Sequence, residues 1–220
     1  MTADPASRTD PSHAPAAIAE GPAGSSSLLL LAHGAGQGPD APFMSAIAAA
    51  VAAAGIRVVR FAFPYMALTA LDGRKRPPDR EPVLREAYRA QIADHRGTAA
   101  RLVIGGKSMG GRIASLVADD AGVDGLVCLG FPFHPPGRPE RYRGGHLAAL
   151  ATPALLCQGE RDPFGSRDEL PAYPLGPACR LVWIADGEHS FKPRKRSGRT
   201  WEQNLESAAR ATADFIAALD

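Results

Sequence analysis

The sequence lacks any apolar run of the roughly 18–20 residues that a membrane-spanning helix requires, and it does not begin with a basic segment followed by an apolar one. We therefore expect neither a membrane anchor nor a signal peptide. The charge is nearly balanced, with 25 basic and 23 acidic residues and a formal net charge of +2. Such a balance gives no overall attraction to nucleic acid or to a membrane surface.

Cysteine is also scarce. The three cysteines are far apart, odd in number and without the Cys or His spacing of a zinc site; they are Cys128, Cys157 and Cys179. Each lies in or beside an apolar run, which predicts buried, reduced thiols and a cytoplasmic location. No metal and no organic cofactor is predicted.

The first 24 residues differ in composition from the rest of the chain. They are rich in Pro, Ala, Ser and Gly and show no periodicity, so we predict a disordered tail over residues 1–24. Residues 25–220 are expected to form one domain, since 45% of the whole chain is hydrophobic and the length allows a sizeable core.

Apolar runs alternate with amphipathic stretches throughout that domain, which predicts a doubly wound, mostly parallel sheet of about six strands. Strands are expected at residues 27–31, 56–61, 102–105, 125–130, 153–158 and 179–184. Helices are expected from an N-cap at Asp40 to Gly55, over 81–95, from the 105–111 turn to 120 and over 200–219, with an aromatic bend at 63–66. In such sheets, ligands bind beyond the carboxyl ends of the strands.

The most informative stretch spans residues 105–111, which contain the pattern Gly-x-Ser-x-Gly as Gly106-Lys107-Ser108-Met109-Gly110. It follows an apolar strand and precedes a helical run. In a nucleophile elbow, a serine occupies a strained turn above a parallel sheet, and small flanking residues avoid a clash. Because the pattern also occurs by chance, it identifies a nucleophile only if the chain supplies a base and an acid.

A serine hydroxyl becomes a good nucleophile when a histidine accepts its proton and a carboxylate orients that histidine. The sequence offers Ser108, Asp162 and His189 in the order Ser, Asp, His, each just after a predicted strand. Glu160 and Asp186 are alternative acids, although Asp186 is close enough to His189 to shape its loop instead. Five other histidines compete for the role of base: His13, His33, His95, His134 and His146.

Two backbone N–H groups are needed to stabilise the oxyanion. We predict that Met109 supplies one of these N–H groups and that Ala35 or Gly34, in a Gly-rich loop, supplies the other. The alternative interpretation is that this loop is only a tight turn between a strand and a helix. Four further residues near predicted strand ends are candidates for substrate contacts: His33, His134, Phe133 and Tyr65. The aromatic members are equally candidates for the core, and His134 for bracing its Pro-rich loop.

The chain resembles the α/β-hydrolase superfamily, and more closely the small bacterial hydrolases related to dienelactone hydrolase, which share a domain with a testis-expressed protein and a subunit of the non-specific-lethal complex. The similar stretches are residues 31–36, 60–66, 73–80, 105–111, 129–137, 158–165 and 189–193. The resemblance implies the α/β-hydrolase fold with little or no lid, with Ser108 as nucleophile, Asp162 as acid and His189 as base. Dienelactone hydrolase itself uses a cysteine nucleophile, where this chain has serine.

These observations predict a serine hydrolase that cleaves a small ester or thioester through an acyl-enzyme; the alternative is a hydrolase-like scaffold with little activity. Two basic segments, residues 74–80 and 192–199, are interpreted either as solvated surface or as a border of the site that favours an anionic substrate or a partner. Lys107 is a candidate to pair with an acid below the site. No nucleic-acid recognition motif accompanies the basic segments.

Overall fold

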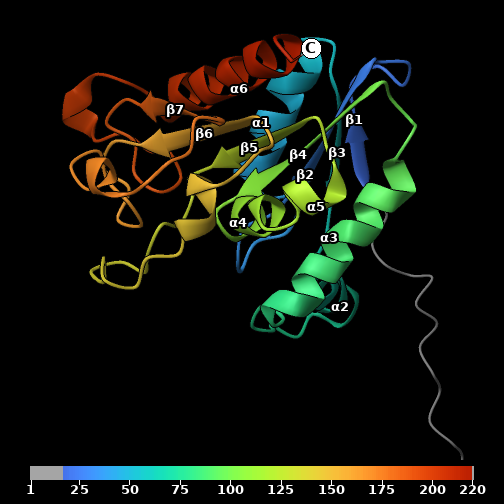
Figure 1. Ribbon diagram of the computed structural model, residues 1–220, viewed down its shortest axis with the longest axis horizontal. Helices are drawn as coiled ribbons and strands as arrows, with labels where there is room; N and C mark the ends of the chain where they lie inside the picture. Colours follow the sequence, from blue (N-terminus) through green and yellow to red (C-terminus); the bar gives the residue numbers. More distant parts are fainter. Residues whose placement is uncertain (1–16, 220) are drawn as a thin grey trace, which may run out of the picture.

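The computed structural model describes residues 17–219, which are built around one seven-stranded sheet (Figure 1). Across the sheet the strands are β1 (Ile18–Glu20), β3 (Arg57–Phe61), β2 (Ser27–Ala32), β4 (Arg101–Lys107), β5 (Gly125–Leu129), β6 (Ala154–Gly159) and β7 (Cys179–Ile184). All neighbouring strands are parallel except β1, which pairs antiparallel with β3. The strand order reverses between β2 and β4, and ligands of doubly wound sheets bind at this kind of switch point.

Helices cover both faces of the sheet. α1 (Pro42–Ala53) and α6 (Trp201–Ala217) lie on one face. The other face carries α2 (Pro64–Asp72), α3 (Glu81–His95), α4 (Met109–Ser115) and α5 (Ala118–Ala121). Short 3-10 helices lie at Gly145–Ala148, Leu170–Ala172 and Lys195–Ser197. The predicted doubly wound α/β fold is thereby confirmed.

The two faces explain why the strands read as continuous apolar runs. Along β2, Leu28 and Leu30 pack with α3 and α4, whereas Leu29 and Leu31 pack with α1 and α6. All four leucines are at most 2% exposed. A parallel strand that is covered on both faces has no solvent side on which polar residues would be favoured.

Two of the predicted helices begin and end within two residues of the expected bounds because their local signals are strong. α3 spans Glu81–His95, as its apolar stripe predicted. α6 begins after Thr200, whose hydroxyl accepts the N–H of Gln203 while the Gln203 side chain accepts the N–H of Thr200, a reciprocal capping box. For α1 the N-cap is Ala41 rather than Asp40, with Pro42 in the first turn.

The structure corrects three local predictions. Part of the predicted tail forms β1, which pairs with β3 and is also held by a 2.5 Å ion pair between Glu20 and the buried Arg60. Residues 1–16 lie outside the described part of the chain. The bend predicted at 63–66 is the start of α2, where Pro64 suits the first helical position. The helix expected up to residue 120 is split into α4 and α5.

Candidate active site

Ser108 occupies the sharp turn between β4 and α4. Its backbone angles are φ 52° and ψ −115°, which non-glycine residues rarely adopt. The chain is tightly packed here: a Cβ on Gly106 would lie 2.6 Å from the carbonyl oxygen of Ala32, and one on Gly110 would lie 2.5 Å from the same atom. The glycines of the Gly-x-Ser-x-Gly pattern are therefore required by contact with β2, and the turn holds the serine in a strained conformation.

The side chains of Ser108, His189 and Asp162 form one continuous hydrogen-bonded chain. Nε2 of His189 lies 2.8 Å from Oγ of Ser108, and Nδ1 lies 2.8 Å and 3.0 Å from the two carboxylate oxygens of Asp162. Because an ionised carboxylate only accepts hydrogen bonds, Nδ1 carries the proton and the lone pair of Nε2 faces the serine hydroxyl. The arrangement therefore places a proton acceptor at Ser108 and an anion behind that acceptor.

Burial and neighbours fix the carboxylate and the imidazole. Asp162 has no exposed surface, and its two oxygens also accept the N–H of Phe164 at 2.8 Å and the side-chain amide of Gln158 at 3.0 Å. The ring of Phe164 packs on that of His189 with centroids 4.2 Å apart. Sequence reasoning missed Gln158 and Phe164. The available signal for Gln158 was a lone amide at the end of an otherwise apolar strand.

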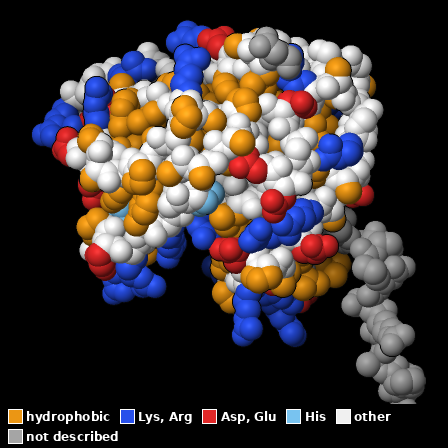
Figure 2. All heavy atoms as spheres, viewed as in Figure 1, with side chains coloured by type: hydrophobic (Ala, Val, Ile, Leu, Met, Phe, Trp, Pro, Cys, Tyr) orange, Lys and Arg blue, Asp and Glu red, His pale blue; other side chains and the backbone are white. Residues whose placement is uncertain are grey.

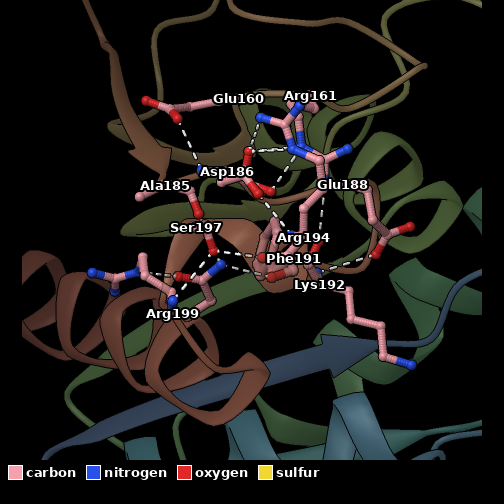
Figure 3. Close-up of polar contacts among 11 residues, drawn as sticks. Glu160, Arg161, Ala185, Asp186, Glu188, Phe191, Lys192, Arg194, Ser197 and Arg199 are labelled. Carbon is pink, nitrogen blue, oxygen red and sulfur yellow. Dashed lines mark hydrogen bonds and ion pairs between the residues drawn. The ribbon is translucent and has the colours of Figure 1, made fainter.

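A polar network holds the loop that carries His189 (Figure 3). Asp186, at φ 50°, binds the guanidinium and backbone N–H of Arg194 and lies 3.1 Å from Nε of Arg161. Glu160 accepts the N–H of Asp186 at 2.8 Å. The two alternative acids therefore brace the loop without contacting His189, and the ion pairs lower the pKa of Asp186 to about 2, chiefly through its hydrogen bond with Arg194.

The last helix completes that support. The side-chain amide of Asn204 on α6 donates to the carbonyl oxygens of Ala185 and Phe191, at 3.0 and 2.8 Å. The indole of Trp201 donates to the carbonyl of Ser190 at 2.8 Å. Both ends of the His189 loop, and Ser190 directly after His189, are thus fastened to α6, so the imidazole has little freedom to move away from Ser108.

Among the competing histidines that the structure describes, only His146 also hydrogen-bonds a serine side chain. Its Nε2 lies 2.8 Å from Oγ of Ser115, but that hydroxyl donates its own proton to the carbonyl of Arg112 at 2.8 Å and is 3% exposed. His146 therefore cannot accept the Ser115 proton. His95 bonds the carbonyl of Gln91 at 2.9 Å on α3, and His13 lies outside the described residues.

The loop after β2 lies against the elbow. A Cβ on Gly34 would be 3.6 Å from Cβ of Ser108, and Ala35 beside it is exposed. His33 accepts the N–H of Phe63 at Nε2 (3.1 Å), so its Nδ1 carries a proton and donates to the carbonyl of Gly34 (2.8 Å). Burial lowers the pKa of His33. With 0% exposed surface, His33 braces this loop, and its role in substrate contact stays a prediction.

The other three candidates for substrate contact are also buried. Phe133 is 0% exposed and stacks on Tyr173 with centroids 5.6 Å apart, so it belongs to the core. His134 is 1% exposed and braces its loop through the carbonyl of Pro135 at 2.8 Å. Tyr65 is 2% exposed and packs on the ring of His33. All three are therefore buried side chains, and their role in substrate contact stays a prediction.

The basic segments differ in their environment. In residues 192–199, Arg194 is held by Asp186 and Arg199 bonds Asn204 at 2.8 Å, so part of this segment is structural. In residues 74–80, Arg76 pairs with Asp72 at 2.6 Å, whereas Arg74, Lys75 and Arg80 are exposed. Figure 2 shows Lys and Arg side chains on the lobe formed by α2 and the start of α3, across a hollow from a second lobe that also carries basic side chains.

No cluster of three or more metal-ligating side chains occurs among residues 17–219. Within the same range, no helix has the length and apolar character needed to cross a bilayer. Cys128, Cys157 and Cys179 are free, and burial raises the pKa of all three thiols.

Comparison with known proteins gives one family and many similar folds. Est1E from Butyrivibrio proteoclasticus has a TM-score of 0.66 at 14% identity, over 91% of this chain and 94% of that one. Dienelactone hydrolase from Anabaena variabilis has a TM-score of 0.64 at 19% identity, over 91% and 90%. XC6422 from Xanthomonas campestris, described as a serine hydrolase without a lid, has 0.61 at 17% identity, over 93% and 96%. These likenesses establish a shared fold. Because a family model described as "Alpha/beta hydrolase domain" also matches residues 25–217, the chain belongs to the alpha/beta hydrolase family.

Proposed function

We propose that this protein is a serine hydrolase that cleaves a small carboxylic ester or thioester through an acyl-enzyme. The observation that carries the proposal is the 2.8 Å contact between Oγ of Ser108 and Nε2 of His189, with Asp162 on the opposite ring nitrogen. The Ser–His distance between Ser115 and His146 is also 2.8 Å, but the Ser115 hydroxyl donates its proton to a backbone carbonyl, and no carboxylate among the described residues bonds the ring of His146. The difference between the two pairs supports a chemical role for Ser108.

In the proposed reaction, Nε2 of His189 accepts the hydroxyl proton while Oγ of Ser108 attacks the carbonyl carbon. The resulting imidazolium is stabilised by the adjacent carboxylate of Asp162. It then donates its proton to the departing alkoxide or thiolate as the carbon–oxygen or carbon–sulfur bond breaks. Water attacks the acyl-enzyme with the same histidine as base, which releases the acid and restores Ser108.

The tetrahedral intermediates carry a negative oxygen, for which we assign two backbone donors. Met109 is the first residue of α4, where amides have no acceptor within the helix. Gly34 and Ala35 offer the second N–H from the loop that lies against Ser108. Removal of a single oxyanion donor typically reduces kcat by about 10²–10³.

The fold favours a small, accessible substrate. The segment between β5 and β6 contains only one short 3-10 helix, Gly145–Ala148, among its described residues. Ser108 is partly exposed, and 18% of the His189 side chain is exposed. Est1E, one of the similar folds, has been solved with ferulic acid bound. We therefore propose soluble, short-chain esters as the first class to examine.

The test is labelling by a fluorophosphonate probe, which phosphonylates serine only where its hydroxyl is activated. Native protein should be labelled, and both Ser108→Ala and His189→Ala should abolish labelling. Ser115→Ala is the matched control and should be labelled as the native chain is. Folded native protein that resists the probe would contradict the proposal and favour a scaffold role.

A further inference from the structure

Lys107 is a buried cation that the proposed reaction does not use. It ends β4, directly before Ser108, and is 5% exposed. Its Nζ has no hydrogen-bond partner and no carboxylate oxygen within 4.0 Å among the described residues. The ring of Phe43 on α1 lies 5.4 Å from it. Burial of an ammonium group without a partner is costly, so its position next to the elbow calls for a physical reason.

The ammonium group lies beside the acid of the site. A Cβ added to Gly130, the residue directly after β5, would be 3.0 Å from Nζ of Lys107 and 3.5 Å from Oδ2 of Asp162. The same point is 3.0 Å from the carbonyl oxygen of His189. Gly130 has φ 66° and no side chain, so the space that the ammonium and the carboxylate share stays open.

The charges around this point are few. Asp162 is fully buried, and its hydrogen-bond donors, from Gln158, Phe164 and the neutral imidazole, carry no net charge. Glu188, in the same loop as His189, is the other carboxylate that acts on Lys107. Phe43 from α1 and Gly130, which follows β5, add no charge. Burial lowers the pKa of Lys107 to about 8, and Asp162 and Glu188 oppose that shift. Lys107 is thus mostly protonated at neutral pH.

We infer that Lys107 is a positioning residue: its ammonium compensates the buried charge of Asp162 and so limits how strongly that carboxylate favours a proton on Nε2 of His189. The inference rests on the proposed function, because it concerns the base of the same site. When Lys107 is charged, Nε2 of His189 remains free to accept the Ser108 proton down to a lower pH than it would without that charge. When the charge is removed, the uncompensated carboxylate stabilises the imidazolium. Nε2 then already carries a proton over a wider pH range and cannot act as a base there.

The test uses two neutral variants, Lys107→Met and Lys107→Gln, with Lys195→Met as control. Lys195 is exposed, so its removal changes the net charge equally but in water, where screening is strong. Ring ¹⁵N signals of His189 are followed by NMR from pH 4 to 10, and the rate of Ser108 phosphonylation by a fluorophosphonate is measured over the same range. In both variants the midpoints of the two curves should rise by about one pH unit, whereas Lys195→Met should leave them unchanged.

The two readouts separate this inference from the proposed function. Labelled native protein with unchanged midpoints in both neutral variants would overturn the inference. Unlabelled native protein with a raised His189 midpoint in the variants would overturn the proposed function and uphold the electrostatic role. If neither variant folds, native spectra decide: the His189 signals should respond a second time as Lys107 loses its proton between about pH 7 and 10, and a single response would overturn the inference.

Discussion

Replacement of Asp162 by Asn tests the site most directly, because the amide has nearly the same shape as the carboxylate. An amide nitrogen directed at His189 cannot accept the proton of Nδ1, which now bonds the carboxylate at 2.8 Å. The imidazole would then hold its proton on Nε2, the atom that has to accept the proton of Ser108. The amide also has no charge with which to stabilise the imidazolium that forms during attack.

The expected loss follows from those two effects. At a charge separation of about 4 Å and an effective dielectric constant of about 20, the lost attraction is about 4 kcal/mol. At about 1.4 kcal/mol per factor of ten, this corresponds to roughly a thousandfold lower rate. The unfavourable tautomer adds to the loss, and the corresponding change in a serine protease lowers kcat by about 10⁴. We therefore expect a decrease of about 10³–10⁴.

The assay is the phosphonylation rate of Ser108, together with hydrolysis of p-nitrophenyl acetate. Thermal unfolding monitors the fold, since the amide introduced by Asp162→Asn keeps an oxygen that can accept the N–H of Phe164. Asp186→Asn is the control, because Asp186 is also an acid near His189 in sequence but bonds Arg194 and Arg161 instead of the imidazole. A rate for Asp162→Asn within tenfold of native would refute the assignment of Asp162 as the orienting acid.

Three further predictions concern the surroundings of the site. Asn204→Leu leaves the two carbonyl acceptors of the His189 loop without their donor. We therefore expect the free energy of unfolding, measured in urea, to fall by about 2–4 kcal/mol. An unchanged value would show that other contacts hold the loop. Asp186 has a folded pKa of about 2, below its ordinary value of 3.8. Its contribution to stability is therefore complete above about pH 4 and is lost as the pH falls towards 2. Trp201 fluorescence should report that acid transition, and Asp186→Asn should remove it. If the exposed cations of segment 74–80 attract substrate, a monoester bearing a free carboxylate should have a lower KM than its neutral analogue. This difference in KM should disappear at about 1 M salt. Equal KM values at low salt would favour the solvated-surface interpretation.

Local signals account for what the sequence predicted well. Each parallel strand is apolar on both faces, and the Gly-x-Ser-x-Gly turn carries its own glycines, so the sheet and the elbow are encoded within a few residues. The order of Ser108, Asp162 and His189 along the chain then selected the three side chains that the structure brings into contact.

The errors concern contacts between residues far apart in the chain. β1 depends on the ion pair between Glu20 and Arg60, which no local pattern reveals. The ring of His33 is held by the N–H of Phe63, thirty residues later, a contact that spacing in the sequence does not reveal. The proximity of Lys107 to Asp162 likewise arises only where the ends of β4, β5 and β6 converge around Gly130. Burial at such convergences is decided by packing and not by spacing in the sequence.

The attachment of the His189 loop to α6 has a consequence for biosynthesis. Ser108 lies near the middle of the chain, but the amide of Asn204 and the indole of Trp201, which hold the loop of the base, are synthesised near its end. A nascent chain still lacking α6 could form the elbow yet would not have the imidazole fastened beside it. The proposed nucleophile therefore gains its histidine partner only after α6 has been made, and we expect fragments released before that point to be inactive.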